Sequence, residues 1–173
     1  MNAQLVSYSD EKHRDKFYEL NHEYLSWVDD EIFRRYGKRV NQNGTVKDYL
    51  DSVFNYFTNA KPPEGLICIL EVDGLAVGMG ALKQLNESIG EIKRMYIRPS
   101  YRGNGFGNQI YRKLENQAKD NGYKQLRLDT AKFLEAAFHI YTKMGYREVN
   151  RYSGGEWDHR NDIDWTIYME KQL

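Results

Sequence analysis

The chain has 173 residues, the size of one ordinary domain, which leaves room for a single core and is too short for two catalytic domains. Its 25 Lys and Arg balance 25 Asp and Glu, so no basic surplus is available to bind nucleic acid or an anionic membrane surface. The 14 Tyr, 7 Phe and 3 Trp supply apolar area that a disordered chain lacks. We therefore predict one folded domain over residues 1–173.

The composition also indicates the cellular compartment and limits the kinds of metal site that the chain can form. No apolar run approaches the roughly 18 residues that cross a bilayer, and residues 1–11 are too polar for a signal peptide, which predicts a cytoplasmic protein without a membrane partner. Cys68 is the single cysteine, so a disulfide framework and a multi-cysteine metal site are excluded, and we expect a buried, inert thiol. The four histidines and the carboxylates do not show the spacing of metal ligands, so the sequence predicts no metal site. We expect ordinary surface or helix residues at His13, His22, His139 and His159.

The first third of the chain predicts a short strand and two helices. Residues 2–8 are a weak strand candidate, and Ser9 offers the N-cap of a helix. The helix is indicated by apolar side chains at helical spacing, namely Phe17, Leu20, Tyr24 and Val28. Residues 29–44 mix acidic and basic side chains without a clear period, which favours an irregular segment, either a substrate loop or a connector. The second helix starts at the capping-box pattern Thr-x-x-Asp of 45–48 and ends near the prolines of 61–63.

Two β-rich runs follow this helix. Residues 66–72 and 75–82 are joined by Asp-Gly at 73–74, a two-residue turn that closes hairpins, so the pattern predicts adjacent antiparallel strands. Gly78 and Gly80 weaken the second strand and indicate a bulge or a close neighbour there.

The remaining chain alternates strands and helices. A strand over 91–97 leads into a glycine cluster at 103–107. The patterns then predict a helix at 110–122, a strand at 126–128, a helix at 133–145 and a terminal strand around 164–169. The polar segment 153–162 is predicted as a loop. This order of elements predicts a mixed α/β chain of the α+β kind.

The segment Arg-Gly-Asn-Gly-Phe-Gly at 102–107 is the most informative stretch. It joins a predicted strand to a predicted helix, where glycines let backbone N–H groups point at one anion and the helix dipole adds about half a positive charge. Arg102 adds a full charge at its mouth. The loop is either a phosphate cradle or a tight turn that needs glycine for its backbone angles alone. Asn108 and Gln109 replace the Lys-Ser/Thr of an ATP or GTP loop, and Asn108 also breaks the dinucleotide pattern G-x-G-x-x-G.

The motif Arg-x-x-Gly-x-Gly after a strand resembles the coenzyme A pyrophosphate signature of the GCN5-related N-acetyltransferase (GNAT) superfamily. Further segments fall at the family's spacings in the same order, namely 91–99 (Glu-Ile-Lys-Arg-Met-Tyr-Ile-Arg-Pro), 122–123, 126–130 and 137–146. Because the whole set is ordered, the chain is identified as a member, although residues 1–60 match only in their pattern of elements. The resemblance implies a single GNAT-type domain, with a mixed central sheet that splays at the cofactor site and carries helices on both faces.

The resemblance also implies how acetyl-CoA, the co-substrate, binds. The fourth strand would lend its backbone to the pantetheine arm, while the side chains there can still belong to the core. The pyrophosphate would rest on the amides of the glycine loop. The cofactor-binding residues that follow from the resemblance are Met95, Tyr96, Ile97, Arg102, Gly103, Asn104, Gly105, Phe106, Gly107, Asn108, Ala137 and Tyr141.

The implied reaction is direct attack of a primary amine on the acetyl thioester. An alkylamine has a pKa of about 10.4 and is mostly protonated at pH 7, so a base is required. Glu91 matches the glutamate that serves as base in some members, and about 13 Å of strand separates it from Met95, which favours action through water. Glu91 could instead be a surface carboxylate or an anchor for a cationic acceptor, and Asp129 is the reserve base.

The second proton step concerns the leaving group. Tyr141 matches the family tyrosine that protonates the departing thiolate, although a tyrosine at helical spacing is also a common core residue. A backbone N–H near Met95 or Tyr96 would stabilise the oxyanion. None of these steps requires a metal.

Two other functions stay open beside the enzyme. The first is a non-catalytic acyl-CoA-binding or regulatory module, which needs neither Glu91 nor Tyr141 for proton transfer. The second is nucleic-acid binding through Lys93, Arg94 and Arg98, which the zero net charge disfavours. The acceptor, a small amine or a peptide amine, is undecided, and so is a homodimer. One group of acidic residues could form the mouth of a site for a polyamine or aminoglycoside, or could lie on ordinary solvated loops. These residues are Asp29, Asp30, Glu31, Glu156 and Asp158.

Overall fold

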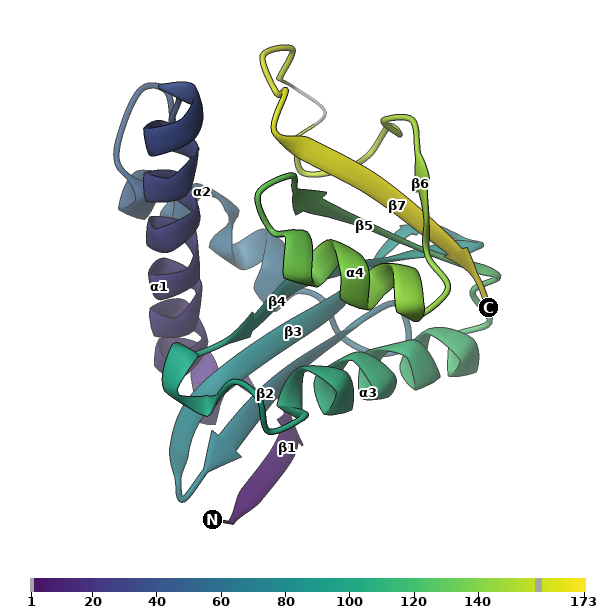
Figure 1. Ribbon diagram of the computed structural model, residues 1–173. Helices are drawn as coiled ribbons and strands as arrows, with labels where there is room; N and C mark the ends of the chain where they lie inside the picture. Colours follow the sequence, from purple (N-terminus) through teal and green to yellow (C-terminus); the bar gives the residue numbers. More distant parts are fainter. Residues whose placement is uncertain (1, 158–159) are drawn as a thin grey trace.

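The computed structural model describes residues 2–157 and 160–173, and its centre is a mixed seven-stranded sheet with helices on both faces (Figure 1). The strands lie in the order β1-β2-β3-β4-β5-β7-β6. In chain order the elements are β1 (Ala3–Ser7), α1 (Asp10–Tyr36), α2 (Val46–Thr58), β2 (Leu66–Val72), β3 (Leu75–Asn86), β4 (Ile89–Ile97), the 3-10 helix η1 (Pro99–Tyr101), α3 (Phe106–Asp120), β5 (Gln125–Ala131), α4 (Glu135–Lys143), β6 (Arg147–Val149) and β7 (Thr166–Gln172). The expected mixed sheet is confirmed.

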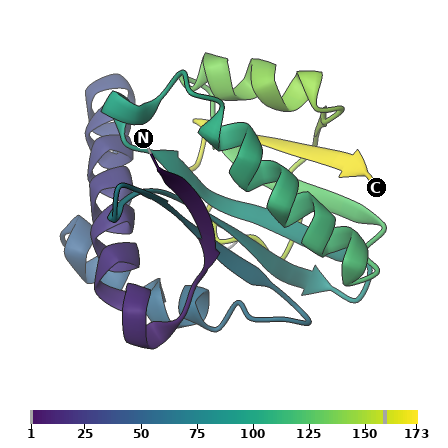
Figure 2. The ribbon, with the colours of Figure 1, turned by 90° about the horizontal axis from the view of Figure 1, so that it is seen from below.

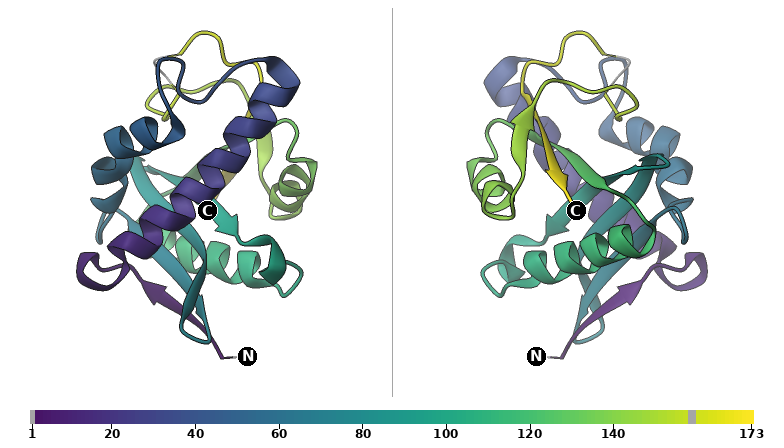
Figure 3. Two further views of the ribbon diagram at one scale, coloured as in Figure 1. Left: turned by 90° about the vertical axis from the view of Figure 1, so that its left-hand side faces the viewer. Right: turned by 90° about the vertical axis from the view of Figure 1, so that its right-hand side faces the viewer.

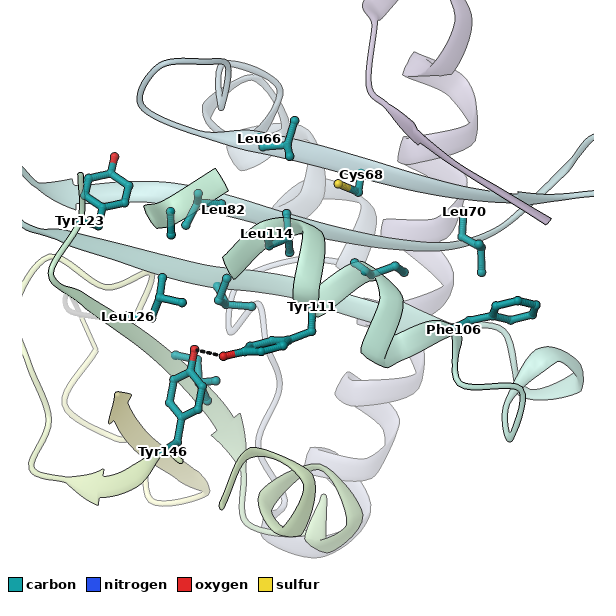
Figure 4. Packing of buried hydrophobic residues seen from close by; sticks show 14 of the residues in the cluster. Leu66, Cys68, Leu70, Leu82, Phe106, Tyr111, Leu114, Tyr123, Leu126 and Tyr146 are labelled. Atoms are coloured by element: carbon teal, nitrogen blue, oxygen red, sulfur yellow. Dashed lines mark hydrogen bonds between the residues drawn. The ribbon is translucent and has the colours of Figure 1, made fainter. Parts of the chain in front are cut away.

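The central strands separate two hydrophobic cores. Side chains alternate between the two faces of a sheet, so Cys68 of β2 faces the core under α3, whereas Ile69 faces the core under α1 and α2. Cys68 is fully buried, as expected, and burial raises the pKa of its thiol to about 11. Figure 4 shows the first core, in which the hydroxyl of Tyr111 lies 3.4 Å from that of Tyr146. Two helical layers therefore hold the sheet from opposite sides, as Figure 3 also shows.

Helix α1 is longer than the sequence pattern predicts, because residues 29–36 belong to it rather than to an irregular segment. The apolar spacing continues past Val28 to Ile32, and both side chains are buried in a third, smaller core. The helix ends at Gly37, which takes a left-handed φ of 66° and donates its N–H to the carbonyl of Phe33. Burial of one helix face outweighs the many charges of this segment.

The first turns of α1 and α2 are closed in different ways. In α2 the expected capping box is confirmed, because Asp48 N–H donates to Thr45 Oγ1 at 3.1 Å and Thr45 N–H donates to the Asp48 carboxylate at 2.8 Å. In α1 the expected Ser9 stands at the N-cap position without a side-chain capping bond. Its backbone N–H donates instead to Nδ1 of the buried His13, 2.9 Å away.

The predicted β2–β3 hairpin is confirmed, with antiparallel pairing up to Val72↔Leu75 across the Asp-Gly turn. Gly80 meets both conditions that the sequence suggests for a glycine in a strand. The pairing of β3 with β4 shifts register between Met79 and Ala81, and a Cβ added at Gly80 would lie 2.5 Å from Cγ2 of Ile110 on α3.

The sheet opens between β4 and β5, and this opening positions the site. The two strands are parallel and pair from Ile89↔Gln125 to Ile92↔Leu128. Beyond that point β4 continues to pair with β3, and β5 continues to pair with β7. Arg94, two residues past the last pair, takes a left-handed φ of 55° where β4 bulges. Figures 1 and 2 show the two strands running apart, which confirms the expected splay.

The C-terminal part completes the sheet and covers one side of the opening. Helix α4 starts at Glu135, slightly later than predicted. Between β6 and β7 runs a segment that we call the C-terminal loop, with described residues 150–157 and 160–165. Arg160 fastens it to the α1–α2 connection by donating to the carbonyls of Arg39 and Val40 at 3.0 and 2.8 Å. None of the described helices combines the length and the apolar character that a bilayer crossing needs.

Candidate active site

The backbone of β4 beyond Ile92 faces the opening of the sheet. Met95 and Ile97 pack toward the core under α3, and Tyr96 is buried in the core under α1. Their side chains are therefore core residues, whereas the β5 side of their backbone has no partner in the described ladders. An extended molecule that carries amide groups can pair with such an edge as an added strand. The geometry fits the pantetheine arm of coenzyme A.

The glycine loop leads from η1 into the first turn of α3. Gly103 and Gly105 take left-handed φ angles of 82° and 76°, so the turn does need glycine for its backbone angles. Gly105 is the N-cap of α3 and offers no side-chain capping bond to the first-turn N–H groups. A Cβ added at Gly103, Gly105 or Gly107 would meet open space rather than protein. Uncapped amides beside open space also fit a pyrophosphate, so the two interpretations of the loop are compatible.

Two polar side chains of the loop shape its outer edge. Arg102 is exposed, its Nε donates to the carbonyl of Ile97 at 3.0 Å, and its guanidinium lies 5.6 Å from the ring centre of Trp27 on α1. Asn104 donates its side-chain amide to the carbonyl of Tyr101 at 3.1 Å, which holds the turn together. Arg102 thus places a cation next to the glycines, where a phosphate would bind.

The remaining expected cofactor residues lie on α3 and α4. Phe106 is buried in the core, whereas Asn108 is exposed on the first turn of α3. Ala137 and Tyr141 are both half-buried and stand one turn apart on α4, on the same helix face. The structure therefore gives Phe106 a packing role, and it leaves Asn108, Ala137 and Tyr141 at surfaces that a ligand can reach.

Tyr141 packs against the core without being sealed in it. Its ring meets that of Tyr146 edge-on, with ring centroids 5.7 Å apart. Burial raises the pKa of Tyr141, and the nearby Tyr24, Tyr111 and Asp129 raise it further. A tyrosine hydroxyl is protonated at neutral pH even without this shift, as an acid for a thiolate must be, and the raised pKa makes it a weaker proton donor than an exposed tyrosine.

Glu91 is 1% exposed, so it is not the surface carboxylate that one interpretation of the sequence allows. Its Oε1 accepts a hydrogen bond of 2.8 Å from the hydroxyl of Tyr152 in the C-terminal loop and lies 3.7 Å from Nζ of Lys93. Burial raises the pKa of Glu91, the Lys93 ammonium lowers it, and the Asp129 carboxylate raises it again. A carboxyl group whose pKa is shifted upward is a better proton acceptor near neutral pH than an ordinary one.

The cations of β4 are buried in ion pairs and are not available to nucleic acid. Lys93 forms an ion pair with Asp129 and lies 3.4 Å from Oε2 of Glu156. Arg94 binds Glu156 with both terminal nitrogens, at 3.2 and 2.5 Å, and its guanidinium lies 4.2 Å from the ring centre of Phe57. Arg98, the third cation of the nucleic-acid alternative, is partly exposed but binds Glu19 and Glu23 of α1. The alternative therefore loses its premise, because Lys93 and Arg94 face the interior and Arg98 is already paired.

The suggested acidic mouth is not formed. Its four described carboxylates all bind cations of this chain: Asp29 and Asp30 bind Arg39, Glu31 binds Arg34 and Arg35, and Glu156 binds Arg94. Asp158, like His159, lies outside the described residues. A polyamine at these four side chains would compete with cations that the chain itself supplies.

Known proteins resemble the chain over most of its length. The sequence profile of the acetyltransferase (GNAT) family matches residues 7–146. The chain belongs to this family. The uncharacterized N-acetyltransferase YjgM of Escherichia coli K12 is 27% identical over 147 residues, which are 83% of this chain and 84% of that protein. The IAA acetyltransferase of Azospirillum brasilense is 30% identical over 117 residues, 67% of this chain and 72% of that protein. The PaiA N-acetyltransferase of Thermoplasma acidophilum, solved in complex with coenzyme A, shares the fold with a TM-score of 0.69, 17% identity and 100% coverage of both chains.

Family membership confirms the expectation of an acetyl-CoA-dependent N-acetyltransferase, with acetyl-CoA as co-substrate. Sequence reasoning found the glycine loop of this acetyltransferase but missed Tyr152 and the bridging position of Lys93. One signal was available. Glu91, Lys93 and Arg94 interrupt an otherwise apolar strand near the centre of the sheet, and charges there require buried partners.

Proposed function

We propose that this acetyltransferase transfers an acetyl group from acetyl-CoA to a primary amine of a small molecule or a peptide by direct attack on the thioester. The observation that carries the proposal is the opening between β4 and β5. There an unpaired strand edge lies beside a buried network of ionisable side chains, which includes Glu91, Lys93 and Asp129. The glycine loop follows Ile97, so the pyrophosphate end of the co-substrate lies at that end of β4. The thioester end then points toward Lys93, where the strands meet.

In the proposed reaction the ammonium form of the acceptor loses one proton to become the attacking amine, the C–N bond forms, the nitrogen loses a second proton as the C–S bond breaks, and the thiolate gains one proton, so that one proton is released overall. Glu91 accepts the amine proton, and because it is 1% exposed behind Tyr152, the proton travels through water or through the Tyr152 hydroxyl. Tyr141 donates a proton to the thiolate. A backbone N–H of Met95 or Tyr96 stabilises the oxyanion.

Thiol release from acetyl-CoA, followed with a thiol reagent across polyamines, amino acids, aminoglycosides and peptide N-termini, tests the proposal. We expect saturable release with one class of amine and an N-acetylated product by mass spectrometry. A rise in melting temperature with acetyl-CoA, but no release with any amine, would instead identify a binding or regulatory module. A homodimer stays a prediction, which sedimentation of the same preparation measures.

A further inference from the structure

Lys93 stands at the centre of the buried network. Its side chain is 4% exposed, and its ammonium contacts carboxylates of three different segments. Glu91 on β4 lies 3.7 Å away, Glu156 of the C-terminal loop lies 3.4 Å away, and Asp129 on β5 forms a direct ion pair with it. An ammonium group can donate three hydrogen bonds, so one lysine suffices to face all three groups.

The position of this lysine coincides with the point where the sheet divides. Ile92↔Leu128 is the last backbone pair between β4 and β5, and Lys93 and Asp129 are the next residue on each strand. Their ion pair therefore continues the contact between the strands by side chains, after the backbone ladder has ended. It forms the closed end of the opening, toward which the thioester points.

The other charged or titratable groups around Glu91 are engaged elsewhere or act in the same network. Lys83, opposite Glu91 on β3, donates to the carbonyl of Tyr56 and lies 3.6 Å from the centre of its ring. Arg127, opposite Glu91 on β5, lies 3.5 Å from Glu170 and 4.8 Å from the ring centre of Tyr152.

From β4 itself, Arg94 is bound to Glu156, and from the C-terminal loop Tyr152 donates to Glu91. Within the described residues, Lys93 is thus the cation whose nitrogen comes within 4 Å of a Glu91 oxygen.

We propose that Lys93 is a positioning residue of this acetyltransferase, whose ammonium joins Glu91, Asp129 and Glu156 across the opening of the sheet and thereby sets the pH range in which Glu91 works as the base. The proposal rests on the proposed function, since it takes Glu91 as the base. Lys93 favours the ionised form of Glu91, whereas the negative charge of Asp129 opposes it. Removing the one or the other must therefore change the basicity of Glu91 in opposite directions.

The test compares the pH profiles of kcat/KM for wild type, Lys93→Met, Lys93→Arg and Asp129→Asn. Loss of the ammonium in Lys93→Met should move the acid limb upward by about one pH unit or more. Loss of the carboxylate in Asp129→Asn should move it downward. Lys93→Arg keeps the charge and should return the limb toward its wild-type position. Lys119→Met, on an exposed part of α3, is the control and should leave the profile unchanged.

A second measurement follows the titration of Glu91 in the absence of turnover. In protein with carbon-13 in the glutamate side-chain carboxyls, an NMR titration follows Glu91 directly, its signal being assigned by its loss in Glu91→Gln. The same opposite shifts are expected, and Asp129→Asn alone decides if Lys93→Met does not fold. Equal positions of Glu91 in all variants, or shifts of the same sign in Lys93→Met and Asp129→Asn, would overturn the proposal. Absence of thiol release from wild type, with the NMR shifts intact, would overturn the proposed function instead.

Discussion

The Tyr152 hydroxyl donates a hydrogen bond of 2.8 Å to Oε1 of Glu91, and both side chains are buried. Tyr152 belongs to the C-terminal loop and Glu91 to β4, so one hydrogen bond connects this loop with the proposed base. A hydrogen bond to an ionised carboxylate stabilises that form, and it lowers the pKa of Glu91 against the larger effect of burial.

Substitution of Tyr152 by phenylalanine should therefore make Glu91 harder to ionise. We expect the acid limb of kcat/KM to move upward by about one pH unit, the equivalent of one hydrogen bond to a charged group. Glu91→Gln should abolish that limb and lower kcat by about 10²-fold or more. Tyr18→Phe removes another hydrogen bond from a tyrosine to a carboxylate, the exposed bond of 2.6 Å to Asp51, which involves neither Glu91 nor its partners, and should leave the profile unchanged. An unshifted limb in Tyr152→Phe would contradict the assignment.

Tyr141→Phe should separate chemistry from binding. If the hydroxyl protonates the thiolate, kcat falls by about 10²-fold or more, while the dissociation constant of acetyl-CoA hardly changes. The matched control is Tyr146→Phe, because the two rings are in contact and the Tyr146 hydroxyl faces Tyr111 in the core. That control should lower the free energy of unfolding by about 1 kcal/mol and leave kcat intact. Activity assays measure kcat, and isothermal titration calorimetry measures the dissociation constant of acetyl-CoA. Weakened acetyl-CoA binding in Tyr141→Phe would count against the acid role.

A methyl group on the glycine loop should weaken acetyl-CoA binding without disturbing the fold. Gly107 lies in the first turn of α3, where a Cβ meets no protein atom within 4 Å, so Gly107→Ala is expected to fold normally and to lose about tenfold or more in affinity. Gly103→Ala adds backbone strain of about 1–2 kcal/mol at its φ of 82°. Gly74→Ala, at the β2–β3 turn, has a φ of 83° and equally open surroundings. Gly74→Ala should lower the melting temperature through the same strain but leave the affinity for acetyl-CoA, measured by calorimetry, unchanged. Equal acetyl-CoA affinities in all three variants would exclude the loop as the pyrophosphate site.

Glu156 should make the protein sensitive to acid. Arg94 and Lys93 outweigh the cost of burial and lower the pKa of Glu156 to about 2, from a usual value near 4.5. Because the folded pKa is the lower one, the stabilisation is complete above about pH 4.5 and is lost as the pH falls toward 2, by a few kcal/mol at most. Glu156→Gln should be less stable at pH 7, since Arg94 loses its partner, and its denaturation midpoint should fall less steeply over this window. Parallel slopes for the two proteins would refute the prediction.

The two helix N-termini offer a matched pair of stability tests. Thr45→Ala breaks the capping box of α2 and should cost about 1 kcal/mol, or roughly 2–4 °C in Tm. Ser9→Ala changes the same kind of position in α1, where the side chain makes no capping bond, so a smaller loss is expected. Differential scanning calorimetry measures both. An equal loss would show that the bonds of Thr45 with Asp48 add nothing to the cap.

Much of the element order follows from local chemistry. The Asp-Gly hairpin turn, the Thr45 box and the glycines after α3 and α4 act within a few residues, so their effect can be deduced from the sequence. The extension of α1 through residues 29–36 could not be deduced in this way. Its charges suggest a loop, and the burial of Ile32 in a core built from distant segments decides for helix.

The sequence by itself determined the family, the strand–glycine loop–helix unit and the position of Tyr141, because each is written in contiguous residues whose backbone chemistry is local. Only the tertiary structure decided the surroundings of Glu91. Tyr152 is 61 residues away along the chain, and Lys93 meets Asp129 because each directly follows the last backbone pair of β4 and β5, Ile92↔Leu128. Burial then raises the pKa of this strand carboxylate, because the loss of water penalises its charge by more than Lys93 and Tyr152 stabilise it.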